Sequence, residues 1–140
     1  MDIVDTATRS KMMAGIRSKD TQPELRLRRF LHGKGFRYKL HDRKLPGTPD
    51  IVLPRYRVAI FVHGCFWHQH PGCKYSTTPQ TNQEKWRAKF EANLKRDQKN
   101  TQMLISQGWR PIVVWECALR KAAKEEELDW IIEVIQGAVI

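Results

Sequence analysis

The chain has 140 residues, 41% of them hydrophobic, so it can bury one core but hardly two, and we expect a single domain over 1–140. Its 25 Lys and Arg against 15 Asp and Glu give a net charge of +10, which favours a polyanionic partner, above all nucleic acid. No segment approaches the roughly 20 apolar residues of a membrane span, and no signal peptide opens the chain, so we expect a soluble cytoplasmic protein. Three cysteines cannot all pair within one chain, which favours metal ligands or free thiols over disulfides.

The first twenty residues have the pattern of a basic arm. Residues Thr8 to Ser18 have helical spacing and carry basic side chains among apolar ones. A second helix is predicted from Thr21, a capping residue, to about Lys34, with Gly35 closing it.

The remaining elements alternate between short apolar runs and long periodic segments. Strands are predicted at Phe36–Leu40, Asp50–Leu53, Val58–Val62 and Pro111–Trp115, and helices at Asn82–Gln107 and Leu128–Ile135. The last strand is apolar throughout, which is typical of a strand covered on both faces. Helices before and after a mixed sheet predict a three-layer α/β/α sandwich.

All three cysteines lie near the same predicted end of the sheet. Four residues separate Cys65 from His70, two separate His70 from Cys73, and Cys117 follows the last strand. This set suits a tetrahedral, closed zinc site that would be structural rather than catalytic. Thiols and surface histidines that merely share a neighbourhood are the alternative.

Two neighbouring strand ends offer residues for hydrolysis. Asp50 opens a strand after a turn, where a carboxylate can bind Mg²⁺, and His63 closes the adjacent strand. Both could meet across the strand pair, with the imidazole as acid or base. Alternatively, Pro49 and Asp50 simply form part of a turn.

Two further acids have competing explanations. Asp97 lies near the apolar stripe of its helix, which favours either a histidine partner or an ordinary ion pair with Lys or Arg. Glu24 occupies the capping-box position, which explains it fully, although a carboxylate there could also hold a water on a second metal.

Aromatic residues flank the Cys/His segment. Phe66 and Trp67 are adjacent outside any periodic element, so they suit a wedge that enters DNA at a weakly stacked step, unless one ring packs beneath the loop. Trp86 could stack on a base, but its place on a helical stripe equally predicts core packing.

Several long motifs resemble the very-short-patch mismatch repair endonucleases. They are Thr8–Met13, Leu45–Asp50, Phe61–His68 and Val114–Cys117, with Trp86, Asn93 and Arg96-Asp97 between them. The resemblance implies a variant of the PD-(D/E)xK nuclease fold that nicks one strand of double-stranded DNA 5′ of the thymine in a T·G mismatch. Such mismatches arise when 5-methylcytosine deaminates.

The resemblance also implies roles for individual residues. Asp50 and the backbone of Val62 would bind Mg²⁺, His63 would activate water with support from Asp97, and His68 would contribute to leaving-group or phosphate chemistry. Glu24 would hold a metal-bound water. The remaining implied residues are those that contact the mismatch, Met13, Phe66, Trp67 and His68, and the structural zinc ligands Cys65, His70, Cys73 and Cys117.

This chain departs from the ordinary nuclease pattern at three places. The second acid and the lysine are replaced by Phe61 and His63, Val62 stands where some relatives have threonine, and Pro71-Gly72 reshapes the loop before Cys73. The resemblance implies a monomer near the nucleoid that cooperates with mismatch-repair proteins. The rival hypotheses are a zinc-containing DNA-binding module that cuts nothing, and a restriction or homing nuclease of the same fold.

Overall fold

The computed structural model describes residues 21–137, so the predicted N-terminal helix and Met13 lie outside the described residues. In chain order the helices and strands are α2 (Gln22–Gly33), β1 (Lys39–Leu40), β2 (Ile51–Leu53), β3 (Val58–His63), α3 (Gln83–Ser106), β4 (Arg110–Trp115), α4 (Glu116–Lys121) and α5 (Asp129–Ile135). Short 3₁₀ turns at Pro54–Tyr56 and Glu125–Leu128 precede β3 and α5. No helix between residues 21 and 137 combines the length and apolar character that a membrane crossing needs.

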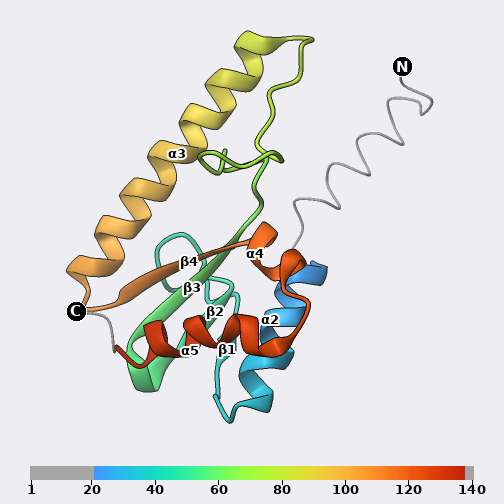
Figure 1. Ribbon diagram of the computed structural model, residues 1–140. Coiled ribbons are helices and arrows are strands. Elements are labelled where there is room, and N and C mark those ends of the chain that lie inside the picture. The colour runs from blue at the N-terminus through green and yellow to red at the C-terminus, as the bar shows by residue number, and fades with distance from the viewer. Residues whose placement is uncertain (1–20, 138–140) are drawn as a thin grey trace.

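The four strands form one mixed sheet in the order β1-β2-β3-β4 (Figure 1). The first two pairings are antiparallel, and β3 pairs with β4 in parallel, with His63 opposite Trp115. The parallel pair needs a long crossover, which the segment from the Cys/His loop through α3 supplies. The C-terminal ends of β3 and β4 therefore lie at the same edge of the sheet.

One face of the sheet carries the hydrophobic core. Because side chains alternate along a strand, Ile60 of β3 and its register partner Ile112 of β4 point to the same side, where they join the apolar faces of α2, α4 and α5. Leu27 and Leu31 of α2 are fully buried there. Thr21 caps α2 by accepting a hydrogen bond from the Glu24 backbone N–H at 3.4 Å.

Helix α3 lies on the opposite side, so the predicted helix–sheet–helix arrangement is confirmed (Figure 1). The two outer layers are unequal, since three helices cover one face and α3 alone covers the other. The prediction that Pro111–Trp115 is covered on both faces is wrong, because Val113 is 37% exposed in β4, an edge strand. The stripe of α3 is also interrupted, with Leu94 51% exposed.

Two segments differ from the predicted elements. The predicted strand from Phe36 shrinks to β1, because Phe36 turns into the core, where its ring lies 5.6 Å from that of Tyr56. Helix α4 was not predicted, since its six residues carry only two buried side chains, Cys117 and Leu119.

Candidate active site and metal centres

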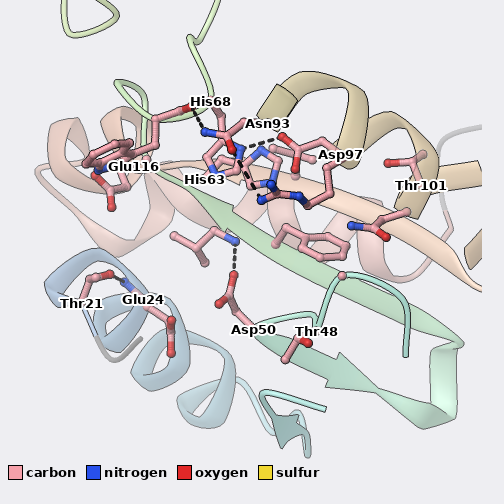
Figure 2. A pocket seen from close by; sticks show the side chains of 18 residues that line it. Thr21, Glu24, Thr48, Asp50, His63, His68, Asn93, Asp97, Thr101 and Glu116 are labelled. Atoms are coloured by element: carbon pink, nitrogen blue, oxygen red, sulfur yellow. Dashed lines mark hydrogen bonds and ion pairs between the residues drawn. The ribbon is translucent and has the colours of Figure 1, made fainter. Parts of the chain in front are cut away.

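A cleft of about 520 Å³ lies between α3 and the edge of the sheet where β2 begins and β3 ends (Figure 2). Its lining includes Asp50, Glu24, His63, His68 and Asp97. All five predicted catalytic residues therefore face one cavity, although α2, β3, α3 and the loops before β2 and after β3 contribute them separately. They fall into a carboxylate group and a histidine group.

Asp50 sits immediately before β2 and is tied to the neighbouring strand. Its Oδ2 accepts a hydrogen bond from the Val62 backbone N–H at 2.7 Å. Burial raises the pKa of Asp50 to about 6, and the nearby Glu24 adds to the rise, while the Val62 hydrogen bond and His41 oppose it. Because burial disfavours the charged form of Asp50, a cation bound nearby would stabilise that form.

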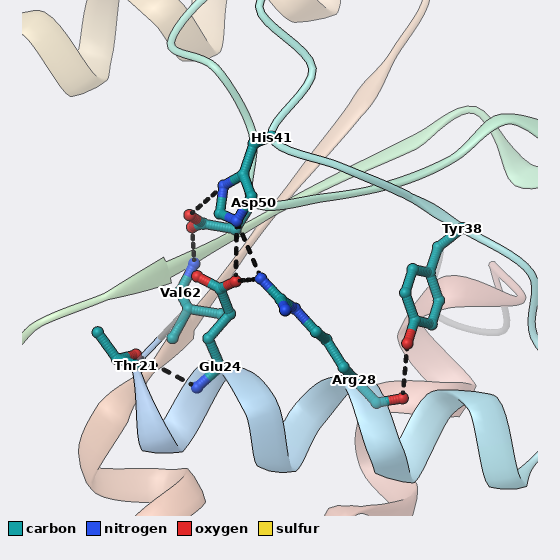
Figure 3. A network of polar contacts seen from close by, with 7 residues as sticks. All are labelled: Thr21, Glu24, Arg28, Tyr38, His41, Asp50 and Val62. Carbon is teal, nitrogen blue, oxygen red and sulfur yellow. Dashed lines mark hydrogen bonds and ion pairs between the residues drawn. The ribbon is translucent and has the colours of Figure 1, made fainter. Parts of the chain in front are cut away.

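Glu24 lies in the first turn of α2, only 2% exposed, and faces Asp50 (Figure 3). Its Oε2 forms an ion pair with Arg28 and lies 3.1 Å from His41 Nε2. The interpretation that helix capping explains Glu24 fully is therefore wrong. Its backbone N–H takes part in the cap, whereas its carboxylate joins a buried polar network at the cleft.

His63 and His68 stack face to face, with ring centroids 3.8 Å apart and an interplanar angle of 3°. Asp97 Oδ2 lies 2.6 Å from His68 Nδ1, so the acid predicted to support His63 is instead paired with His68. Of the two explanations for Asp97, the histidine partner is confirmed. The difference arises because the loop after β3 folds His68 back between His63 and α3.

Burial lowers the pKa of His63 to about 4, and the neighbouring His68 lowers it further, against the opposing charge of Asp97. His63 is only 8% exposed. A neutral imidazole at pH 7 is the form that can accept a proton, so His63 has the protonation state of a base.

The Cys/His segment gathers a third group of side chains. Cys65, His70, Cys73 and Cys117 each place one ligand atom within 4.8 Å of the others. Tetrahedral zinc with Zn–S bonds near 2.3 Å separates its sulfur ligands by about 3.8 Å, so these atoms could close around the ion with small adjustments. The His70 ring stacks on Trp115, centroids 4.1 Å apart, which orients it toward Cys117.

Phe66 and Trp67 do not stand apart from packed structure, as the sequence suggested. They form a ring cluster with Trp86 and Phe90 of α3, with centroid distances of 5.0–5.9 Å. Trp67 is only 7% exposed, and the ammonium group of Lys89 lies 5.1 Å from its ring centre. The rings of both Phe66 and Trp67 therefore pack against α3, whereas the sequence suggested packing of only one of them as the alternative to a wedge.

Two cleft features were missed by the sequence reasoning. His41 contacts the carboxylate group, although the loop that holds it offered no periodic signal. Asn100 lines the cleft beside Asp97, as does Asn93, which the sequence analysis named only as a motif residue; their spacing of seven residues on α3 was the available sign that they share a helix face. Asn93 Nδ2 donates to the Trp67 carbonyl at 3.1 Å, which ties the loop to the helix.

The described domain thus places the carboxylates of Asp50, Glu24 and Asp97 and two histidines around one open cleft on a strongly basic chain. Carboxylates can bind a divalent cation beside a phosphate, and imidazoles can move protons to and from water and leaving oxygen. This is the chemistry of a hydrolase that acts on phosphodiesters.

Comparison with known proteins names the family within that class. The chain belongs to the Vsr family of DNA mismatch endonucleases, whose sequence model, DNA mismatch endonuclease Vsr, matches residues 1–74. The DNA mismatch endonuclease Vsr of Escherichia coli is 46% identical over 137 residues, which cover 93% of this chain and 87% of that protein. The type II nicking enzyme V.NmeAIP of Neisseria meningitidis is 43% identical over 139 residues, 99% of each protein.

A solved structure is also similar. The catalytic domain of the homing endonuclease I-Bth0305I matches with a TM-score of 0.47 and 21% identity, over 85% of this chain and 91% of that one.

Proposed function

We propose that this protein nicks one strand of double-stranded DNA 5′ of the thymine in a T·G mismatch and thereby starts very-short-patch repair. The observation that carries the proposal is the single cleft in which Asp50 and Glu24 face His63, His68 and Asp97, in a chain of the Vsr family. The net charge of +10 supplies the attraction to the DNA backbone.

We propose Mg²⁺ as the catalytic cation. Asp50 would bind it together with the backbone of Val62, and Glu24 would orient water at its edge; carboxylate and carbonyl oxygens are the ligands that Mg²⁺ prefers. When bound, the cation neutralises charge that develops on the scissile phosphate. The raised pKa of Asp50 supports this role, because burial and the nearby Glu24 disfavour its negative charge, which a bound cation would stabilise.

The histidine group would handle the protons. His63, neutral at pH 7 because of its lowered pKa, would take a proton from the attacking water. His68 is oriented by Asp97 through Nδ1, which leaves its Nε2 for the phosphate or the leaving oxygen. Asp97 would act directly on His68 and, through the stacked rings, only indirectly on His63.

We propose a structural zinc ion bound by Cys65, His70, Cys73 and Cys117. Four protein ligands close the coordination shell, so the ion would have no open position for chemistry. Burial raises the pKa of the Cys65 thiol to about 12, and a bound cation would reverse that by stabilising the thiolate. The zinc would fix the loop that carries His68.

Mismatch recognition is assigned to the ring cluster. Phe66 and Trp67, with His68 beside them, would enter the DNA at the mispaired step, where unstacking costs least, and Trp86 would stack on a base. Met13 of the basic arm within residues 1–20 would enter from the opposite groove. The edge-to-face packing of Phe66 against Trp86 supports a wedge that is rigid before DNA arrives.

The last part of the proposal concerns the oligomeric state, location and partners of the protein. We infer a monomeric single domain over 1–140 that works in the bacterial cytoplasm at the nucleoid and cooperates with mismatch-repair proteins.

A nicking assay tests the function. Labelled duplexes with a T·G mismatch, other mismatches or perfect pairing are incubated with zinc-loaded protein and Mg²⁺ and resolved on a denaturing gel. We expect one nick, 5′ of the mispaired thymine, and we expect Asp50→Ala to bind the duplex without cutting it. An intact strand would favour a DNA-binding module without activity, whereas equal cutting of paired DNA would favour a restriction or homing nuclease.

A further inference from the structure

His41 lies in the loop between β1 and β2 and is held there by its backbone. Its φ angle is +49°, a left-handed conformation that is uncommon outside glycine and that asparagine, aspartate and histidine adopt more often than other residues. Its N–H donates to the carbonyl oxygen of Asp50 at 3.1 Å, which extends the pairing of the two strands by one bond. The loop therefore holds His41 beside Asp50 despite an unfavourable backbone conformation.

The imidazole of His41 spans the two carboxylates of the cleft (Figure 3). Nε2 lies 3.1 Å from Glu24 Oε2, and Nδ1 lies 3.8 Å from Asp50 Oδ1. Each ring nitrogen thus faces a different acid, one from the start of α2 and one from the start of β2. Arg28 approaches the same Nε2 to 2.9 Å and also pairs with Glu24, which fixes the ring from the helix side.

The distances match what a cation site needs. Glu24, His41 and Asp50 each place one ligand atom within 4.8 Å of the others. The carboxylates of Glu24 and Asp50 repel each other when both are ionised. The His41 ring lies between them and limits how far each can move relative to the other. Imidazole itself is a poor ligand for Mg²⁺, which prefers oxygen, so the ring serves better behind the carboxylates than on the cation.

We propose that His41 is a positioning residue that holds Glu24 and Asp50 in one arrangement for the divalent cation, an inference that rests on the proposed function. Outer partners of this kind change metal affinity by about 10- to 100-fold when removed.

The test compares His41→Asn with the parent protein. Asparagine tolerates the left-handed backbone, so the variant removes the ring while it keeps the loop conformation. We expect the Mg²⁺ concentration that gives half-maximal nicking of a T·G duplex to rise about tenfold, with kcat at saturating Mg²⁺ changed less than about threefold. Binding of Mn²⁺, followed by the electron paramagnetic resonance signal of the free ion, should weaken to a similar degree.

Controls separate positioning from other roles. His32→Asn, at an exposed histidine on α2, should leave both titrations unchanged. Glu24→Gln combined with His41→Asn should weaken metal binding little more than the stronger single variant, because both act on one arrangement. If His41→Asn lowers the melting temperature by more than a few degrees, the same titrations are made with His41→Gln.

Three results would overturn the proposal. They are unchanged metal titrations, a fall in kcat alone, and a loss confined to Mn²⁺, which would make His41 a direct ligand. Failure of the parent protein to nick T·G duplexes would reject the proposed function, while the Mn²⁺ titration would still show whether removal of the His41 ring weakens cation binding.

Discussion

Gly47 offers a quantitative test of how the loop before Asp50 is packed against the cleft. Its φ angle is +77°, and a Cβ added there would lie 2.9 Å from Asn100 Nδ2 and 3.1 Å from Phe61 Cε1. Gly47→Ala therefore introduces both an unfavourable backbone conformation and an overlap with two cleft residues. Gly35 is the matched position, since its φ is +91° and nothing lies within 4 Å of an added Cβ.

The two contributions can be estimated separately. A left-handed conformation costs a residue with a side chain about 1–2 kcal/mol, which is the full effect expected for Gly35→Ala. Overlap in packed structure adds about 1–3 kcal/mol, and the low end fits here because the Asn100 amide can turn away. We expect Gly47→Ala to lower the free energy of unfolding by about 1 kcal/mol more than Gly35→Ala does.

Urea unfolding of both zinc-loaded variants measures this difference, provided the slope of unfolding free energy against urea stays constant. Asn100→Ala should recover part of the loss in Gly47→Ala and none in Gly35→Ala. Equal losses in the two glycine variants would refute the reasoning, because the overlap would then be absent. We also expect Gly47→Ala to slow nicking, since relief of the overlap moves either the Phe61 ring or the loop that leads to Asp50.

Three other predictions concern the histidine group and the zinc ligands. Asp97→Asn should lower kcat for nicking roughly 10- to 100-fold without weakening DNA binding, because His68 loses its orienting charge, whereas Glu91→Gln on the same helix should have no effect. The pKa of His63 is about 4 in the folded protein and 6.5 in the unfolded chain, so the unfolded chain binds a proton at a higher pH than the folded protein does. The stability that this difference provides is complete above pH 6.5 and is lost as the pH falls through 4. Urea unfolding at several pH values should show this loss, at most about 3 kcal/mol, in the parent protein and not in His63→Gln. Cys117→Ser should lower the melting temperature by about 10 °C and make it insensitive to a zinc chelator, and a chelator response equal to that of the parent would contradict the proposed site.

Long periodic segments were predicted well because helical spacing and cap residues mark them in the sequence itself. Helix α3 was predicted as Asn82–Gln107 and found at Gln83–Ser106, and α2 begins at Gln22, directly after the predicted cap Thr21. Single-sequence patterns could not reveal α4, which is too short to show a period, nor the exposure of Val113, which depends on β4 lying at the sheet edge.

The candidate site was predicted by residue but not by partner. Adjacent strand ends predicted that Asp50 and His63 could meet, whereas Asp97 was placed with them only by the family resemblance. Sequence reasoning could not foresee that the loop after β3 inserts His68 between His63 and Asp97. It also missed His41, whose position depends on a left-handed backbone angle rather than on any repeating pattern.

The parallel pairing of β3 with β4 has a consequence for folding. In the observed register His63 lies opposite Trp115, so Cys65 and Cys117 each follow their strand by two residues and meet at one edge. A slip of one residue would move Cys117 by about 3.3 Å and turn the alternate side chains to the wrong face. Only a correctly aligned sheet brings all four ligands of the proposed zinc ion together, so binding of that ion would favour the correct strand alignment during folding.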